Sequence, residues 1–149
     1  MNITMNKKTI ISFGIILGLI LVVFLTFSEK SSVKDYQKDV DIIQGTMYDL
    51  EGSFVYLLGA SDKSACKNWI KTNRKDMKSE MKTKLGAKFV DSQFDLYEVC
   101  LKVFDEYGVI GNPQLAMQYL KEIDKDPRVT KANDKAEKVK TELFDKAGL

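Results

Sequence analysis

The apolar positions of residues 33–61 recur in alternating steps of three and four residues. This heptad spacing is held over four repeats and predicts one long helix with a bulky apolar seam. Because four later segments also carry apolar faces, we interpret this helix as the central post of a bundle rather than a coiled-coil stalk. The seam residues are Val33, Tyr36, Val40, Ile43, Met47, Leu50, Phe54 and Leu57.

Three glycines share the heptad period on the opposite side of this helix. Gly45, Gly52 and Gly59 are each followed by a small residue, and Ser53 belongs to the same ridge. Glycine costs about 1 kcal/mol relative to alanine inside a helix, so a row of three needs a physical reason such as close packing. Two interpretations stay open: another helix of this chain covers the ridge, or a partner protein docks on it.

Four further helical segments follow, and capping residues mark their ends. Asn112 and Asp126 each precede a proline, which is the typical start of a helix, and Gly86 and Gly148 are interpreted as stops. No stretch alternates with period two over enough residues to predict a sheet. The expected helices span about 63–85, 87–107, 113–125 and 127–147.

The second of these five helices carries a row of basic residues opposite its apolar face. We interpret the row as a solvated surface, and the alternative is a dock for an acidic partner or for anionic lipid head groups. The acid-rich helix that follows predicts an antiparallel hairpin, in which Lys82 faces Asp91 and Lys78 faces Asp95. The basic row consists of Lys67, Lys71, Lys75, Lys78 and Lys82.

The two cysteines, Cys66 and Cys100, predict a disulfide if this part of the chain is exported. The disulfide needs a hairpin register that differs by seven residues from the register of the ion pairs. We favour the disulfide, since exposed ion pairs contribute only about 0–1 kcal/mol each. The alternatives are two free buried thiols or bridges between chains.

An uncharged, apolar run near the amino terminus predicts a membrane anchor. Residues 10–27 are 18 apolar or small residues, and as a helix they would cover roughly 27 Å. The expected organisation is a cytoplasmic stub at 1–9, a transmembrane signal-anchor at 10–28 and an exported domain at 29–149. A cleaved signal peptide is the alternative. Gly14 and Gly18 form a G-x-x-x-G pair that would allow two such helices to dimerise.

Composition and charge exclude several classes of function. Without Lys7 and Lys8, residues 29–149 hold 21 basic and 21 acidic residues, so no basic excess points to nucleic acid. The chain has no histidine, which removes the commonest general base and zinc ligand. No carboxylate pair has lysozyme spacing, and no glycine-rich phosphate loop occurs. We expect neither catalytic residues, cofactor nor metal.

The sequence therefore predicts an all-α protein, with an N-terminal transmembrane helix followed by a compact four- to five-helix bundle with one disulfide. The leading hypothesis is a membrane-anchored protein-interaction module of the bacterial cell envelope, which scaffolds a membrane complex or inhibits an exported toxin or lytic enzyme. The second is a periplasmic ligand-sensing bundle with a pocket lined by Trp69, Tyr97 and Tyr107. The third and least favoured is a cell-wall hydrolase.

Overall fold

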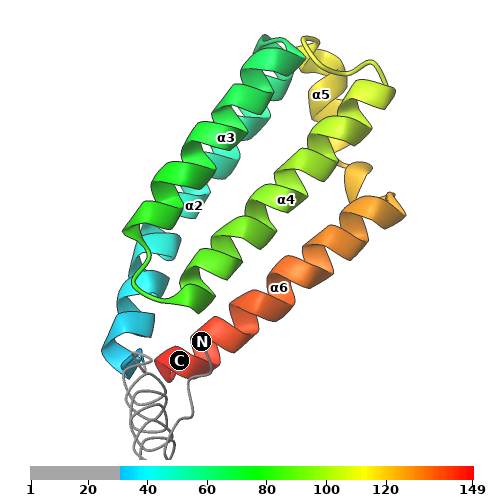
Figure 1. Ribbon diagram of the computed structural model, residues 1–149. Coiled ribbons are helices and arrows are strands. Elements are labelled where there is room, and N and C mark those ends of the chain that lie inside the picture. The colour runs from blue at the N-terminus through cyan, green and yellow to red at the C-terminus, as the bar shows by residue number, and fades with distance from the viewer. Residues whose placement is uncertain (1–30) are drawn as a thin grey trace, which may run out of the picture. The chain divides into compact units, whose positions relative to one another are not determined.

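The computed structural model describes residues 31–149, and this part of the chain is all-α (Figure 1). Five α-helices and one short 3-10 helix follow each other with tight connections, which confirms the predicted fold class in its all-α and bundle parts. The elements are α2 (Val33–Ala60), α3 (Lys63–Glu80), α4 (Lys84–Glu106), α5 (Pro113–Leu120), η1 (Ile123–Lys125) and α6 (Pro127–Ala147).

Side-chain caps begin these helices where the sequence predicted starts. The Asp62 carboxylate accepts a hydrogen bond from the Ala65 amide at 2.8 Å, and Asn112 accepts one from Leu115 at 3.1 Å. Asp126 caps α6 through the Arg128 amide at 2.9 Å. Each cap satisfies an amide that has no partner inside its own helix. Gly148 ends α6 with φ +74°, a left-handed conformation that glycine adopts without strain.

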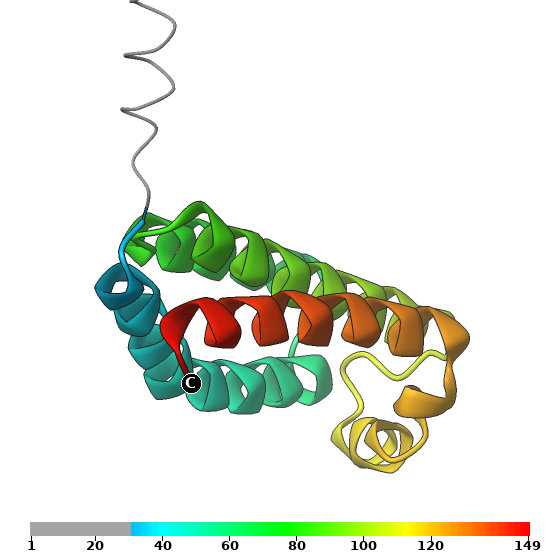
Figure 2. The same cartoon turned by 90° about the horizontal axis from the view of Figure 1, so that it is seen from below.

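Helices α2, α3, α4 and α6 form a four-helix bundle. Helix α3 packs between α2 and α4, and α6 packs against both α4 and α2, so that the four helices close a ring. Figure 2 shows α6 lying across the space between α4 and α2. Helix α5 and η1 cover one end of the ring, where the Gly111 amide donates to the Leu58 carbonyl at 2.9 Å.

The interior of the bundle combines aliphatic side chains with a group of four aromatic rings. The Phe54 ring centroid lies 5.6 Å from that of Trp69 and 4.8 Å from that of Tyr97, while Phe94 meets Tyr97 edge-on at 5.3 Å. These contacts join α2, α3 and α4, so the aromatic group holds three of the four helices together. The largest fully buried side chains are those of Phe94, Phe104, Leu58, Ile70, Leu143, Val40, Val90, Val103 and Val109.

A buried carboxylate fixes the connection between α3 and α4. Asp39 is 0 % exposed and accepts hydrogen bonds from the Lys82 amide at 2.6 Å, the Thr83 amide at 3.0 Å and the Thr83 hydroxyl at 2.6 Å. Gly86, interpreted from the sequence as a helix stop, instead lies in the first turn of α4, where the Thr83 hydroxyl accepts a hydrogen bond from its amide. Helix α3 ends at Glu80, so the turn is three residues long.

Both predicted registers of the α3–α4 hairpin are wrong. Lys78 pairs with Asp91 at 2.6 Å rather than with Asp95, and Asp95 instead meets Arg74 at 3.2 Å. The ends of the hairpin are set by the three-residue turn that Asp39 holds. The register therefore falls between the one that the ion pairs predicted and the one that the disulfide required.

The predicted disulfide between Cys66 and Cys100 is wrong, because both thiols are free. The pair Lys78–Asp91 places Cys66 opposite Val103 in the hairpin. Cys100 is three residues away from Val103, which is about 4.5 Å along the helix axis. The two side chains also face different surroundings. Cys66 is fully buried within the bundle, whereas Cys100 lines a cavity on the other side of α4.

The predicted transmembrane helix needs a correction as well. The anchor at 10–28 and its Gly14–Gly18 pair lie outside the described residues. Within 31–149 no helix has both the length and the apolarity to cross a membrane, since every long helix there carries several charged residues. The fold class for these residues is thus an all-α bundle with neither a membrane span nor a disulfide, and they do not support the predicted membrane localisation.

Candidate functional site

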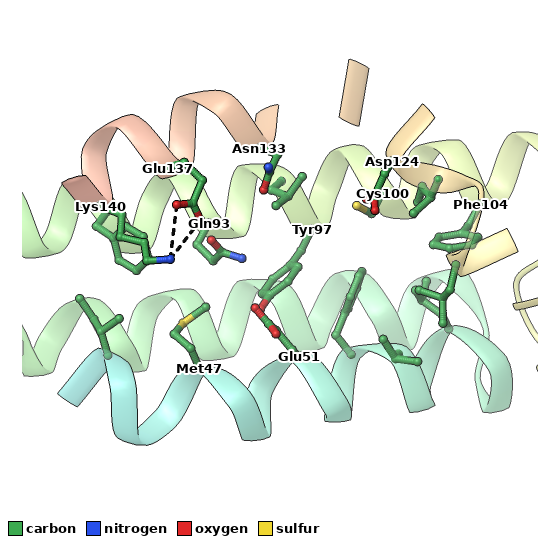
Figure 3. Close-up of a pocket in the computed structure, with 18 of the residues that line it drawn as sticks. Met47, Glu51, Gln93, Tyr97, Cys100, Phe104, Asp124, Asn133, Glu137 and Lys140 are labelled. Atoms are coloured by element: carbon green, nitrogen blue, oxygen red, sulfur yellow. Dashed lines mark hydrogen bonds and ion pairs between the residues drawn. The ribbon is translucent and has the colours of Figure 1, made fainter. Parts of the chain in front are cut away.

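A cavity of about 620 Å³, here called the central cavity, lies between α2, α4 and α6. In Figure 3, α4 runs behind the cavity, α6 and α2 form its two sides, and η1 lies near one end. Its apolar lining consists of Ile43, Met47, Phe54, Val55, Leu58, Phe89, Leu96, Phe104, Leu120, Ile123 and Phe144. Its polar lining consists of Gln44, Glu51, Gln93, Tyr97, Cys100, Asp124, Asn133, Glu137 and Lys140.

Helical spacing explains why these side chains meet. The α2 wall combines three members of the predicted heptad seam, Ile43, Met47 and Phe54, with residues beside the seam. The latter are Gln44, Glu51, Val55 and Leu58. On α4, Gln93 and Tyr97 are four residues apart and point to the same side of the helix. The cavity thus lies where the seam of α2 faces α4 and α6, because the side chains there do not fill the space between the three helices.

Tyr97 carries the most unusual polar group of the cavity. Its side chain is 5 % exposed, and no group of residues 31–149 is in hydrogen-bond geometry with its hydroxyl, although the Gln93 side chain lies near enough to lower the pKa of Tyr97 in part. Burial raises the pKa of Tyr97 well above its usual value, and the nearby Glu51 carboxylate raises it further. The hydroxyl therefore stays protonated, and it can donate one hydrogen bond and accept others from a molecule in the cavity.

Cys100 lines the same cavity but is not activated for chemistry. Burial raises the pKa of its thiol to about 12, and the carboxylate of Asp124 adds to that effect. A nucleophilic cysteine needs a depressed pKa and a cationic or helix-amino-terminal environment. Neither condition is met here, so Cys100 contributes a polarisable, weakly polar surface rather than a reactive group.

Of the three residues predicted to line a ligand pocket, the structure places only Tyr97 in the central cavity. Trp69 packs behind the cavity wall, with ring centroids 5.6 Å from Phe54 and 6.0 Å from Tyr97. Tyr107 lies at the far end of α4, 54 % exposed and stacked on Tyr119 at 5.3 Å.

The polar residues of the cavity carry a signal that the sequence analysis missed. Gln93 interrupts the apolar face of α4 between Phe89 and Tyr97, four residues from each, and Asn133 interrupts that of α6 between Val129 and Ala136. An uncharged polar side chain in the middle of a buried stripe needs a hydrogen-bond partner. Asn133 is exposed, so only the partly buried Gln93 could have indicated from the sequence a polar group at this cavity.

The glycine ridge divides into an open part and a covered part. A Cβ atom at Gly45 or Gly52 would meet none of the described atoms within 4 Å, whereas one at Gly59 would lie 3.0 Å from Pro113 Cα of α5. Ser53 is exposed. Two exposed tyrosines flank Gly52 at a distance of four residues, Tyr48 at 83 % and Tyr56 at 73 %. Among residues 31–149, the ridge is covered at Gly59 and open at Gly45 and Gly52.

Four members of the predicted basic row lie on the exposed side of α3, and the fifth, Lys82, lies in the turn that follows α3. Lys78 is paired with Asp91, and the amide of Lys82 supports Asp39, but the other ammonium groups form no ion pair with a carboxylate of residues 31–149. Lys71, Lys75 and Lys78 border an open hollow of about 390 Å³ together with Arg74, whose Nε is buried without a hydrogen-bond partner among residues 31–149. Its members are Lys67, Lys71, Lys75, Lys78 and Lys82.

No group of three or more histidine, cysteine, aspartate or glutamate side chains within the described range is placed to hold a metal ion. Comparison of the chain with protein-family models, with curated proteins and with solved structures found no match.

Proposed function

We propose that the bundle binds a small molecule in the central cavity, and that the molecule has an apolar body and at least one hydrogen-bonding group. The observation that carries this proposal is the hydroxyl of Tyr97, which is buried, without a partner among the described residues, and adjacent to a cavity of about 620 Å³. This is the ligand-binding alternative among the functions predicted from the sequence.

The size and chemistry of the cavity fit this function. Small-molecule sites usually measure about 300–1,000 Å³ and combine a mainly apolar lining with a few polar groups that fix orientation. A buried hydroxyl without a partner costs about 1–3 kcal/mol. Phenylalanine at position 97 would fill the same space without that cost, so the hydroxyl is explained best by a partner that arrives with the ligand.

Trp69 provides a built-in reporter for a test. It is the one tryptophan of the chain, and its ring contacts the outer side of the cavity wall at Phe54 and Tyr97. Titration of the full-length chain with n-octanol, a simple apolar body with one hydroxyl, should shift the Trp69 emission and raise the melting temperature. No change at millimolar n-octanol in either signal would count against the proposal.

Two matched variants make the test specific. Tyr97→Phe should weaken n-octanol binding about tenfold, which corresponds to about 1.4 kcal/mol for one hydrogen bond, while it raises the melting temperature of the free protein. Tyr107→Phe removes an equivalent hydroxyl at the exposed end of the same helix. It should change neither the affinity for n-octanol nor the melting temperature. Equal affinities in both variants would mean that the Tyr97 hydroxyl does not contact the probe.

A protein-interaction function, the leading prediction from the sequence, is the second candidate, and one observation favours it. Tyr48, Gly52 and Tyr56 form an exposed face of α2, where a Cβ at Gly52 would meet no atom of residues 31–149 within 4 Å. Exposed tyrosines are enriched where proteins bind each other, and a glycine between them lets a partner helix approach closely. The partner expected here is an amphipathic helix of another protein.

The second candidate is tested by a photo-crosslinking residue at position 48 in cells, with and without Gly52→Leu. The leucine points into open space, so the bundle should stay folded by circular dichroism. Loss of the crosslinked partner in the folded variant supports docking on this face. If the crosslinks are unchanged in Gly52→Leu, the contact does not depend on this face, and the docking function is wrong.

A further inference from the structure

The charged groups around the central cavity are mostly negative. Glu51 of α2, Asp124 of η1 and Glu137 of α6 contribute three carboxylates, against the single ammonium of Lys140. That ammonium is already occupied, because Lys140 Nζ lies 3.2 Å from Glu137 Oε1 and 3.4 Å from its Oε2. The cavity lining therefore has a net negative charge with no free cation of its own.

Two of these carboxylates lack a counter-charge. Glu51 and Asp124 take part in none of the ion pairs formed within residues 31–149. Both residues are exposed, so solvent and salt screen their charge in part, but the two carboxylates at the rim of the cavity still attract a cation and repel an anion.

The position of Glu51 connects this charge to the buried hydroxyl. Figure 3 shows Glu51 reaching from α2 toward the hydroxyl end of Tyr97, which descends from α4. The carboxylate is close enough to raise the pKa of the Tyr97 hydroxyl. A carboxylate and a neutral hydroxyl that converge at one place offer two acceptors to an ammonium group, which carries several N–H donors and no acceptor.

The apolar part of the cavity suits the remainder of such a ligand. The rings of Phe54 and Tyr97, whose centroids are 4.8 Å apart, border the same place, and Phe104 lies farther along the lining. Aromatic faces attract cations as well as hydrocarbon, so they favour an organic cation over an anion of the same size.

We propose that the central cavity selects an amphipathic organic cation, an amine whose ammonium lies between the Glu51 carboxylate and the Tyr97 hydroxyl and whose apolar body lies along Phe54 and Phe104. This inference rests on the proposed ligand-binding function and specifies its ligand class. Lys140 does not oppose it, since Glu137 compensates its charge.

The test compares three probes that share one apolar body and differ in charge: octylamine, n-octanol and octanoate. Binding to the full-length chain at pH 7 is followed by Trp69 emission and by calorimetry. Octylamine should bind at least about tenfold more tightly than n-octanol, and octanoate should bind most weakly. Added salt should weaken octylamine binding and leave n-octanol unchanged.

Glu51→Gln and Asp49→Asn are matched variants, because each removes one carboxylate from α2 while only Glu51 lines the cavity. Glu51→Gln should reduce the preference for octylamine over n-octanol about tenfold, and Asp49→Asn should leave it unchanged. An equal loss in both variants, or none in either, would show non-specific attraction and overturn the proposal.

The outcomes separate this inference from the function on which it rests. If n-octanol or octanoate binds as tightly as octylamine, the selection for a cation fails and the ligand-binding function stands. If none of the three probes binds to the full-length chain, both proposals fail.

Discussion

The carboxylate of Asp39 on α2 occupies the space that a side chain at Gly86 on α4 would need. A Cβ atom at position 86 would lie 2.2 Å from Asp39 Oδ2 and 2.7 Å from its Cγ. The carboxylate cannot move aside easily, since three hydrogen bonds from Lys82 and Thr83 hold it. The glycine thus lets the first turn of α4 approach α2 closely enough for a carboxylate to fix both elements.

Gly86→Ala should destabilise the protein by about 1–3 kcal/mol, although alanine is the better helix former. The clash with Asp39 exceeds the gain in helix propensity. Gly52→Ala is the control, because the same change in open space should stabilise the protein by about 0.5–1 kcal/mol. Urea unfolding of both variants measures the difference, and shifts of the same sign would contradict this account of Gly86.

Asp39→Ala should cost about 3 kcal/mol or more. The change leaves the Lys82 and Thr83 amides and the Thr83 hydroxyl without their acceptor, and each buried donor without a partner costs about 1–3 kcal/mol. Asp41→Ala, at an exposed position two residues along α2, should stay within about 0.5 kcal/mol of the parent. Equal effects in the two variants would remove the role assigned to Asp39.

Cys66 and Cys100 should remain reduced thiols in the folded protein under air. Burial raises the pKa of both thiols, so little thiolate is present to begin oxidation. Intact mass should match the fully reduced chain, and a reductant should not change the melting temperature. Both thiols should react with Ellman's reagent only after unfolding. A mass lower by two hydrogens would show that a disulfide forms after all.

Asp126 should contribute to acid unfolding over a defined range of pH. Its hydrogen bonds from the Arg128 side chain and amide lower its pKa to about 2 from its usual 3.8. Because the folded state favours the ionised form, this contribution is complete above about pH 4 and is lost as the pH falls toward 2.

Unfolding by urea across pH 2–5 tests this contribution. Asp126→Asn should flatten the fall in stability between about pH 4 and pH 2. Asp134→Asn is the control, at an exposed position on the same helix. If both variants keep the slope of the parent, the pairing of Asp126 with Arg128 does not contribute to stability.

The helices of this protein follow from local features of the sequence. The seam of α2 is visible as a period of three and four residues, and Asp62, Asn112 and Asp126 cap helices because each needs only the amides that follow it. The ends of helices do not follow from the sequence where a glycine can either end one helix or lie within the next. A glycine after an apolar helix, such as Gly86, is the usual signal for a helix end. That Gly86 instead belongs to the first turn of α4 depends on its contact with Asp39, which lies 47 residues earlier.

The pairing of Cys66 with Cys100 could not be decided from spacing, because it depends on hairpin register and on the direction in which each helix is rotated. The turn held by Asp39 sets that register, and Asp39 is distant in sequence from both cysteines. The glycine ridge had the same limitation. Whether Gly52 is open and Gly59 covered depends on where α5 packs.

Within residues 31–149, the sequence by itself determined the all-α class and most of the helix starts, since periodicity and caps act within a few residues. Only the tertiary structure decided the free thiols, the open face at Gly52 and the central cavity. A cavity is the volume that packing leaves between α2, α4 and α6, and no local pattern specifies that volume. The long heptad helix does form one wall of the bundle, but part of its seam faces a cavity rather than a filled core.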